Sequence, residues 1–365
     1  MDPIVNWVGN KARETDLLLS LFPLDFQNYY EPFVGSGAVF LKVEACQFFI
    51  NDRCKELAEL YRAIKGNREL FYYYLECFAD AWINIDREYF LQSDYLISAY
   101  KAFRVEQTCY TDMVLEVESL VGRIKYDNVF SIKFTRDEYA FNLEKRFQVV
   151  RKFISMNKDE RTGGEYDDGK ILRKIRTGMK ASIFSFLQNL YNRHGSLDDL
   201  RVALFYFLMM YNASGAYLLD KRHEFSIPYA GEKYNDKRIE SKYRSLQEKF
   251  LREKLLKTYI GGSDYRTFLR RTHPGKEDFL FLDPPETGNY IQNGGWEFTY
   301  DDYRKLLNYL DNECSSRWLM VVRNEEKLRE MIISRPNRIA AYSKYDLRLM
   351  DMEDESATHL LICNY

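Results

Sequence analysis

Three consecutive residues, Asp283, Pro284 and Pro285, directly follow the apolar run 279–282. The run is typical of a buried strand, which places the three residues at a strand's carboxyl end, where open α/β sheets bind their ligands. Two prolines fix the backbone and remove two N–H donors, so the turn presents carbonyl acceptors beside a carboxylate. Such a group of acceptors could bind an exocyclic amine and direct its lone pair towards an electrophile. A solvated turn is the simpler interpretation of these residues taken alone.

A second group of residues that could do chemistry surrounds Gly35 and Gly37, between the apolar run 26–34 and a helical pattern at 38–45. Glycines at this place let the backbone approach a ligand closely, and the N-terminus of a following helix supplies free N–H groups. Asp52 follows the next apolar run, 17 residues after Gly35, and could hold ribose hydroxyls. The pattern predicts either a nucleotide-type site or a structural turn.

The elements that must position these residues alternate near both ends of the chain. Strands are predicted at 26–34, 46–50, 279–282, 318–322 and 359–365, and helices at 38–45, 55–66 and 299–312. Alternation of this kind is typical of a parallel, doubly wound sheet. Residues 67–244 change to long aromatic and charged stretches that favour helices. We therefore predict an α/β, Rossmann-like domain from 1–66 plus 245–365, interrupted by a large, mainly helical insertion at 67–244.

The composition is that of an ordinary globular protein of 365 residues, with 46% hydrophobic and 30% charged residues and a formal net charge of −2. Apolar runs fall short of the roughly 20 residues that a membrane helix needs, and the N-terminus lacks the pattern of a signal peptide. We predict a cytoplasmic protein without a membrane partner. Six cysteines and four histidines are dispersed along the chain, so we also predict no metal site.

Six short segments occur in a distinctive order along the chain. They are NWVGNK (6–11), EPFVGSGAVFL (31–41), IND (50–52), FSIPYA (225–230), GGSDYRTFL (261–269) and FLDPP (281–285). This set resembles the motifs of DNA adenine-N6 methyltransferases of the Dam-like (D12) class. The resemblance covers about residues 1–66 and 205–365 and leaves about 70–200 as a long insertion. In that class the cofactor glycines come first, the recognition region next and the DPP segment last, which explains the interrupted architecture.

The resemblance implies an enzyme that transfers the methyl group of S-adenosylmethionine to the N6 amine of adenine in double-stranded DNA, with the adenine flipped out of the duplex. It implies a restriction-modification or phage-related context, and a target-recognition and DNA-binding role for the inserted region. The residues that it places around the cofactor are Trp7, Lys11, Glu31, Pro32, Phe33, Gly35, Gly37, Asp52, Asp264, Tyr265 and Asp283. The catalytic residues that it implies are Asp283, Pro284, Pro285 and Glu286.

Three positions depart from the family pattern. The DPPY motif of the family ends here in Glu286, and a carboxylate cannot stack on a flipped adenine as a tyrosine ring does. The N-G-x-x-R recognition motif appears as residues 214–218, SGAYL, and the S-N step as Arg323-Asn324. The cofactor motifs are therefore kept, while the acceptor and DNA motifs are altered.

Two hypotheses of different class follow from these departures. The first is an active methyltransferase whose aromatic platform has moved to Tyr290, Trp296 or Phe298. The second is a binding protein that holds S-adenosylmethionine, DNA or both without transferring a methyl group. Asp283 and the two prolines favour the enzyme. Whether Glu286 is natural or engineered is left open by the sequence.

A basic stretch in the insertion gives separate support for a nucleic-acid partner. Residues 141–180 contain eleven Lys or Arg and six Asp or Glu. A solvated helix face is the ordinary interpretation of such charges, whereas phosphate contact is favoured in a Dam-like protein. The candidate DNA-binding residues are Lys170, Arg173, Lys174, Arg176 and Lys180. Whether the insertion also binds a protein partner is left open.

Overall fold

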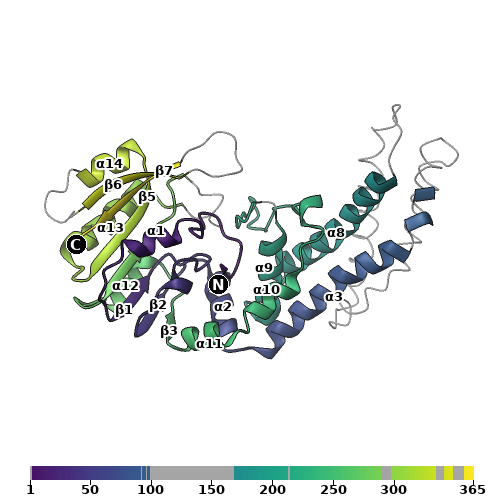
Figure 1. Ribbon diagram of the computed structural model, residues 1–365, viewed down its shortest axis with the longest axis horizontal. Coiled ribbons are helices and arrows are strands. Elements are labelled where there is room, and N and C mark those ends of the chain that lie inside the picture. The colour runs from purple at the N-terminus through teal and green to yellow at the C-terminus, as the bar shows by residue number, and fades with distance from the viewer. Residues whose placement is uncertain are drawn as a thin grey trace. The chain divides into compact units, whose positions relative to one another are not determined.

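The computed structural model describes residues 2–91, 93–95, 97–98, 168–212, 214–288, 297–333, 341–347 and 357–365. The chain divides into two compact units (Figure 1). The sheet unit consists of Met1–Arg68, Gly215–Phe225 and Ser245–Tyr365, and the helical unit of Glu69–Ser214 and Ser226–Arg244. We predicted residues 215–225 as part of the insertion, but they belong to the sheet unit, because Tyr217 stacks on Trp7 of the N-terminal segment.

Seven strands form one sheet in the order β3-β2-β1-β4-β5-β7-β6. They are β1 (Asn28–Glu31), β2 (Gln47–Ile50), β3 (Thr258–Ile260), β4 (Phe279–Leu282), β5 (Arg317–Arg323), β6 (Ala341–Leu347) and β7 (Ala357–Cys363). Strands β3, β2, β1, β4 and β5 are parallel, whereas β7 pairs antiparallel with both β5 and β6. The predicted α/β fold with a mainly parallel sheet is confirmed.

The winding of the parallel strands reverses between β1 and β4. From β1 the chain moves outwards to β2 and β3, and it later returns to β4 and β5 on the other side of β1. Open α/β sheets bind ligands at such a switch point, outside the carboxyl ends of the strands. Glu31 ends β1, Asp52 follows β2 and Asp283 follows β4. Three acidic residues from distant segments therefore meet at one edge of the sheet.

Two edge strands and one helix differ from the sequence predictions. The sequence analysis did not predict β3, whose three residues are too few for a periodic pattern, or β6, which mixes apolar and charged residues. The helix predicted at 38–45 is wrong: only the 3₁₀ turn η1 (Phe40–Lys42) forms, and Val43 is already extended with ψ 143°. Because Phe40 is fully buried in this turn, tertiary packing overrides the helical spacing.

The helices of the sheet unit are α1 (Thr15–Ser20), α2 (Lys55–Lys65), α11 (Lys249–Leu256), α12 (Tyr265–Thr272), α13 (Tyr300–Asn312) and α14 (Glu326–Ile333). Capping residues mark the start of α13 and the end of α2, two of these helices. The predicted helices at 55–66 and 299–312 are confirmed as α2 and α13. A capping box between Thr299 and Asp302 starts α13, and α2 ends at Gly66, whose N–H donates to the Arg62 carbonyl.

The core of the sheet unit surrounds β4, all four of whose residues are buried. Leu280 and Leu282 of β4 pack with Leu306 and Leu310 of α13 and with Met320 of β5. Since well-packed side chains have few alternative positions, this core fixes where β4 ends. The Asp283 turn is thereby held at a defined place on the sheet edge.

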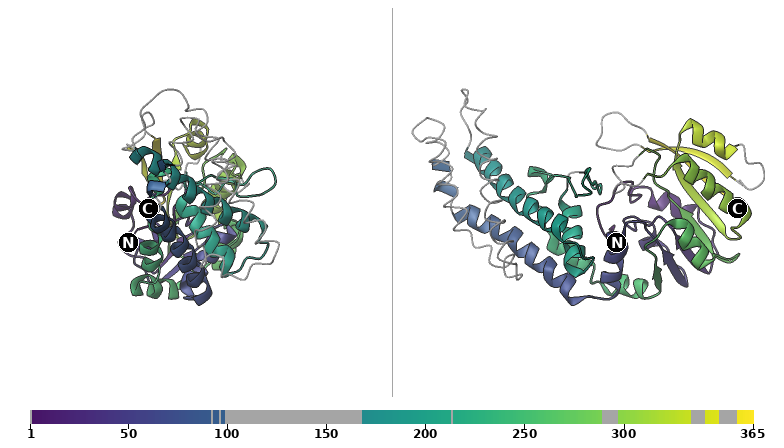
Figure 2. Two further views of the ribbon diagram at one scale, coloured as in Figure 1. Left: turned by 90° about the vertical axis from the view of Figure 1, so that its right-hand side faces the viewer. Right: turned by 180° about the vertical axis from the view of Figure 1, so that it is seen from behind.

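The helical unit contains α3 (Glu69–Leu91), α8 (Asp168–Arg193), α9 (Asp199–Tyr211), η2 (Glu232–Tyr234) and α10 (Ile239–Ser245). Helix α9 is buried on all sides from Val202 to Tyr211 and packs against α3 and α8, which lie side by side (Figures 1 and 2). An apolar helix of this kind forms the centre of a bundle. The predicted helical character holds for the described part of this unit. Among the described residues of both units, no helix is long and apolar enough to span a bilayer.

Candidate active site

A cavity of about 270 Å³ lies at the carboxyl ends of β1, β2, β4 and β5, at the switch point of the sheet. Most of the residues predicted for cofactor binding and catalysis line it. These are Trp7, Lys11, Glu31, Pro32, Phe33, Gly35, Asp52, Tyr265, Asp283, Pro284, Pro285 and Glu286. The lining also contains Arg53, Arg323 and His359, for which the sequence analysis predicted no role in a site. Gly37 and Asp264 lie outside it.

The glycine turn brings the backbone against the N-terminal motif. Gly35 has φ +50° and Gly37 φ +75°, conformations that favour glycine. A Cβ atom at Gly35 would lie 3.0 Å from Cδ1 of Trp7, whereas one at Gly37 would meet the Tyr61 hydroxyl at 2.6 Å. Gly35 is therefore required at the cavity wall. Gly37 is required for packing against α2.

Asp52 ties the glycine turn to the loop that follows β2. Its Oδ2 accepts a hydrogen bond from the Gly35 N–H at 3.2 Å, and its Oδ1 accepts one from the Cys54 N–H at 2.8 Å. Burial raises the pKa of Asp52 to about 6, against the opposing effect of the backbone N–H donors. The carboxylate is therefore ionised at neutral pH and loses its charge in mildly acidic solution.

Lys11 and Asp283 form an ion pair in the cavity wall. The Lys11 Nζ lies 3.0 Å from Oδ1 of Asp283 and also donates to the Gly9 carbonyl at 3.1 Å. Burial raises the pKa of Asp283, and the charge of Lys11 opposes that effect. For Lys11, burial acts to lower the pKa, but Asp283, Glu14 and Glu286 together raise it above its ordinary value. Lys11 is thus a stable counter-charge for the carboxylate of the DPP turn.

Glu31 supplies a second buried carboxyl group beside this pair. It is 3% exposed, and its Oε2 accepts a hydrogen bond from the Tyr29 hydroxyl at 2.8 Å. Burial raises the pKa of Glu31 well above its usual range, and the nearby Asp283 adds to the effect although the Tyr29 bond opposes it. The acidic side chains of Glu31 and Asp283, which come from the ends of adjacent strands, therefore share one cavity wall with Lys11.

The turn after Asp283 is fixed by side chains from α13 and β5. Tyr303, which is buried, donates from its hydroxyl to the Pro285 carbonyl at 3.1 Å. Glu286 Oε2 lies 3.3 Å from Nη1 of Arg323 at the end of β5. Neither contact was predicted, because both depend on how β4, β5 and α13 pack together. Pro285 therefore already accepts one hydrogen bond from within the protein.

The aromatic platforms that we proposed in place of the family tyrosine have different outcomes. Phe298 is 0% exposed and packs edge-on against Tyr303 in the core, so it offers no face to a ligand. Tyr290 and Trp296 lie outside the described residues. Among the three candidates, Phe298 is therefore excluded by burial.

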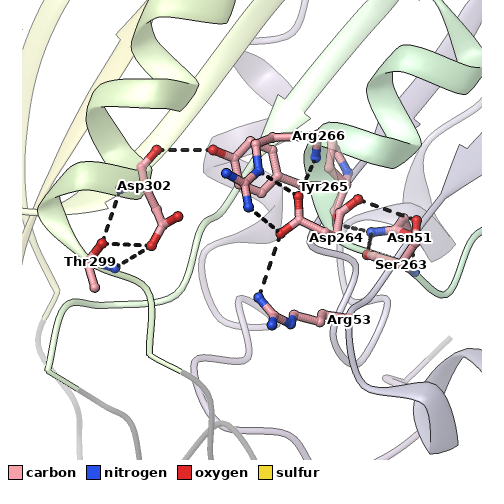
Figure 3. Close-up of polar contacts among 9 residues, drawn as sticks. Asn51, Arg53, Ser263, Asp264, Tyr265, Arg266, Thr299 and Asp302 are labelled. Atoms are coloured by element: carbon pink, nitrogen blue, oxygen red, sulfur yellow. Dashed lines mark hydrogen bonds and ion pairs between the residues drawn. The ribbon is translucent and has the colours of Figure 1, made fainter.

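The Asp264 side chain points towards Arg266 and Arg53, and Arg53 is one of the residues that line the cavity (Figure 3). It caps α12 by accepting from the Arg266 N–H at 3.0 Å, and it also accepts from the Arg266 side chain at 2.8 and 3.1 Å. The Nη1 atom of Arg53 lies 3.6 Å from Oδ2 of Asp264. Tyr265 does line the cavity, and its hydroxyl donates to the Asp302 carbonyl at 3.1 Å.

Asn51 holds two loops together beneath the cavity, a role that the sequence analysis missed. Its Nδ2 donates to the carbonyls of Pro32 and Ser263, and its Oδ1 accepts from the Ser263 N–H at 3.1 Å (Figure 3). A Cβ atom at Gly261 would come within 2.4 Å of that oxygen. The side chain that precedes Asp52 therefore anchors the β1 loop to the loop after β3. Its place inside the IND segment (50–52) was the available signal.

The candidate DNA-binding residues of α8 differ sharply in exposure. Arg173 is 54% exposed and forms an ion pair with Glu232 at 3.2 Å. Arg176 binds Asp86 at 2.7 Å and Asp236 at 2.8 Å. The side chains of Lys170 and Lys174, and residues 141–167 of the basic stretch, lie outside what the structure describes. Arg173 is thus the described member of the set that solvent reaches most freely.

Lys180 is a correction to the sequence analysis. Its side chain is 1% exposed, lies 3.0 Å from Asp86, donates to the Asn235 carbonyl at 2.6 Å and sits 4.6 Å over the Trp82 ring. Burial lowers its pKa, although Asp86 opposes this. A buried lysine with these partners serves the packing of the helical unit and cannot reach a phosphate.

A mainly parallel sheet with a cavity at its switch point is the arrangement in which open α/β proteins bind their ligands. The family described as "D12 class N6 adenine-specific DNA methyltransferase" matches residues 7–345. This range is most of the chain, which therefore belongs to that family. The motif resemblance noted in the sequence is confirmed at the level of the family.

Individual relatives are similar over shorter stretches. The chain is 24% identical over 181 residues to the type II methyltransferase M1.LlaDCHI of Lactococcus lactis subsp. cremoris, covering 48% of this chain and 62% of the relative. It is 31% identical over 123 residues to the type II methyltransferase M.CviBI of Paramecium bursaria Chlorella virus NC1A, covering 31% and 45%. It is 37% identical over 65 residues to the DNA adenine methylase of Haemophilus influenzae, covering 18% and 23%. The matched regions thus span less than two thirds of each of these relatives.

Proposed function

We propose that the chain binds S-adenosylmethionine in the cavity at the switch point and transfers its methyl group to the N6 amine of adenine in DNA. The observation that carries the proposal is the Lys11–Asp283 pair, which joins the N-terminal motif to the DPP turn inside one cavity. Membership of the D12 family supports the reaction, and the names of the relatives given above agree with it.

Three features of the cavity fit S-adenosylmethionine. Asp52 stands after β2, where an acidic residue accepts hydrogen bonds from ribose hydroxyls. The rings of Phe33 and Tyr265, with centroids 5.3 Å apart, give an apolar wall for a base. The carboxylate of Asp283 is of the right sign to attract a sulfonium. When bound, this cofactor supplies a methyl group on a cationic sulfur.

The role of the DPP turn is to accept the target amine. The Asp283 carboxylate and the Pro284 carbonyl accept hydrogen bonds from N6 and localise its lone pair, while Pro285 is held by Tyr303. The cofactor would supply the methyl group and be released as a neutral thioether, while Asp283 would hold the amine towards that group and accept, for release to solvent, the proton that the amine loses as its bond to carbon forms. Because the amine becomes acidic only as its bond to carbon forms, no base is needed beforehand. The charge of Lys11 opposes the effect of burial, which raises the pKa of Asp283.

The substrate that we propose is double-stranded DNA with its target adenine flipped into the cavity. Target recognition is assigned to the helical unit, as proposed from the sequence, with Arg173 retained as a phosphate contact because it is exposed. Arg176 and Lys180 are not retained, since both are engaged within the unit.

The alternative function is binding of S-adenosylmethionine and DNA without methyl transfer. Glu286 favours it, because a carboxylate stands where the family motif has a tyrosine. Incubation with S-adenosylmethionine labelled in its methyl group and random-sequence duplex DNA, followed by digestion to nucleosides, distinguishes the two. Labelled N6-methyl-2′-deoxyadenosine is expected from wild type and is lost in Asp283→Asn. Cofactor binding by calorimetry without any labelled nucleoside would favour the alternative.

A further inference from the structure

Glu286 and Arg323 lie near the carboxyl ends of two neighbouring strands: Arg323 is the last residue of β5, and Glu286 stands four residues after the end of β4. β4 and β5 are parallel with Leu282 opposite Met320, so the residues that follow both strands emerge at the same edge as Asp283. The Glu286 and Arg323 side chains meet at 3.3 Å and are 40% and 44% exposed. Both line the cavity. The pair is therefore part of the wall beside the turn that accepts the amine, and it is open to an incoming group.

A second link joins the turn after β4, which carries Glu286, to the loop that follows Arg323. Thr287, next to Glu286, donates to Oε2 of Glu325 at 2.8 Å, and the Tyr300 hydroxyl donates to the same oxygen at 2.8 Å. Glu325 stands two residues after Arg323. The loops after β4 and β5 are thus tied twice, once by the ion pair and once by these hydrogen bonds, which limits how far the Arg323 guanidinium can move.

An adenine taken out of a duplex loses its stacked neighbours and needs a flat surface in the pocket that receives it. A carboxylate provides none. A guanidinium is planar, stacks on bases and aromatic rings, and is held in place well by a carboxylate. Of the two side chains in the pair, Arg323 therefore has the shape to receive a base and Glu286 the charge to orient it.

We propose that Arg323 is the platform on which the target adenine stacks and that Glu286 is the positioning residue that holds its guanidinium. This inference rests on the proposed function for the identity of the base. It accounts for a glutamate after the two prolines, since the platform comes from β5 and the residue after Pro285 needs only to anchor it.

Binding of DNA tests the platform without requiring turnover. Affinity is measured for duplexes that carry one unpaired adenine, or an abasic site at the same place, in random flanking sequence with S-adenosylhomocysteine present. Wild type is expected to prefer the adenine duplex by about 5- to 150-fold, the range for one stacking contact. Arg323→Ala and Arg323→Lys should both lose this preference, because lysine keeps the charge without the plane.

A matched control and a rescue sharpen the test. Arg304→Ala removes another exposed arginine, paired with Asp301 at 2.9 Å on α13, and should keep the wild-type preference. Adding Glu286→Tyr to Arg323→Ala should restore the preference, because the tyrosine supplies a ring at the neighbouring position. Calorimetry with S-adenosylhomocysteine establishes that each variant keeps its folded cavity.

The outcomes separate this inference from the proposed function. Wild type without an adenine preference, Arg323→Lys with full preference, or Arg323→Ala with tighter adenine binding would each overturn the platform, the last by showing that the pair closes the pocket. Methyl transfer that is unchanged in Arg323→Ala would also overturn it and leave the proposed function intact. An adenine preference that depends on Arg323, in a protein that methylates no DNA, would support the platform and overturn the proposed function.

Discussion

The two units each contain a buried lysine paired with an aspartate, and the two pairs differ in what surrounds them. Lys11 meets Asp283 at 3.0 Å in the wall of the switch-point cavity. Lys180 meets Asp86 at 3.0 Å, but its ammonium is also close to a backbone carbonyl and to the Trp82 ring. Asp283 forms an ion pair with Lys11, whereas Asp86 forms ion pairs with both Lys180 and Arg176.

The pKa values of the two lysines shift in opposite directions for that reason. Burial acts to lower the pKa of both. For Lys11 the three acids Asp283, Glu14 and Glu286 outweigh burial and raise it, whereas the charge of Arg176 works against Asp86 and leaves the pKa of Lys180 lowered. A lysine that faces several carboxylates in a cavity is set up for a charged ligand. A lysine that is enclosed by an aromatic ring, a backbone carbonyl and a shared aspartate, as Lys180 is, contributes to the packing of its unit.

The largest expected effect is the loss of methyl transfer when the Lys11–Asp283 pair is changed. Asp283→Asn keeps the shape of the side chain but removes the charge that localises the amine's lone pair. Methyl transfer should fall by about 10²- to 10³-fold, as for loss of one electrostatic group of an active site, measured as label incorporated into DNA. Asp301→Asn, which changes an exposed aspartate on α13, serves as the control and should leave transfer unchanged. Equal rates for wild type and Asp283→Asn would remove the DPP turn from the mechanism.

A second prediction addresses the pair in the helical unit. Lys180→Met should lower the free energy of unfolding by about 3 kcal/mol, the lower end of the range for breaking a buried pair, because Arg176 still binds Asp86. Urea unfolding followed by tryptophan fluorescence measures it. Arg173→Met, in an exposed pair with Glu232, should change stability by no more than about 1 kcal/mol. A Lys180 variant as stable as wild type would mean that this pair is not part of the packing.

A third prediction uses the pKa of Asp52, which burial raises to about 6. Asp52→Asn should weaken S-adenosylmethionine binding by about 10- to 150-fold, since hydrogen bonds to a charged group contribute about 1.5–3 kcal/mol. Wild-type affinity should fall as pH decreases through about 6, because the carboxylate that accepts the ribose hydroxyls becomes protonated. Calorimetry between pH 5 and 8 would test both effects, and a pH-independent affinity would exclude Asp52 from the contact.

The raised pKa of Asp52 affects the stability of the ligand-free protein in the opposite direction: ionisation of Asp52 favours binding of the cofactor but lowers the free energy of unfolding. The folded pKa of Asp52 lies above its ordinary value, so the native protein binds the proton more tightly than the unfolded chain between about pH 4 and 6. This contribution stabilises the fold at low pH and is lost as pH rises through about 6. Asp52→Asn should therefore raise the thermal midpoint at pH 7.5 in the absence of cofactor, while it weakens binding. A lowered midpoint would contradict the assignment of the raised pKa.

The smallest expected effect concerns the surface of α8. Arg173→Ala should reduce the slope of log affinity against log salt for duplex DNA by about 0.9, the value for one phosphate contact. The matched variant Lys180→Met should leave the slope unchanged, since the ammonium is buried. If both variants left the slope unchanged, the described basic residues of α8 would be an ordinary helix face.

Motifs tied to local backbone geometry were predicted well from the sequence. Gly35 was singled out for a close approach of the backbone, and it has a positive φ with Trp7 next to its missing Cβ. The strand before Asp283 was found from its apolar run, and the helix that begins at Tyr300 was predicted at 299–312. These features depend on neighbours within a few residues, so the sequence contains the information for them.

Burial and pairing across the chain were not predictable in the same way. The count of basic residues at 141–180 could not distinguish exposed Arg173 from buried Lys180, because exposure is set by α3 and by residues 235–236. The sequence also did not show that the Asp264 side chain binds Arg266 and Arg53, because the contact with Arg53 depends on how the loop after β2 lies against α12. The helix expected at 38–45 gave way to the 3₁₀ turn η1, in which Phe40 is buried, and the chain is extended at Val43.

The sequence by itself determined that this chain has a D12-type arrangement of motifs on an α/β sheet, since glycine turns, strand ends and a DPP turn are local features. Tertiary structure alone decided that Lys11 and Asp283 meet, that Tyr303 occupies the Pro285 carbonyl and that Glu286 binds Arg323. Each of these contacts joins residues from separate strands and helices. Their distances depend on how the sheet orders its strands, which no short stretch of sequence specifies.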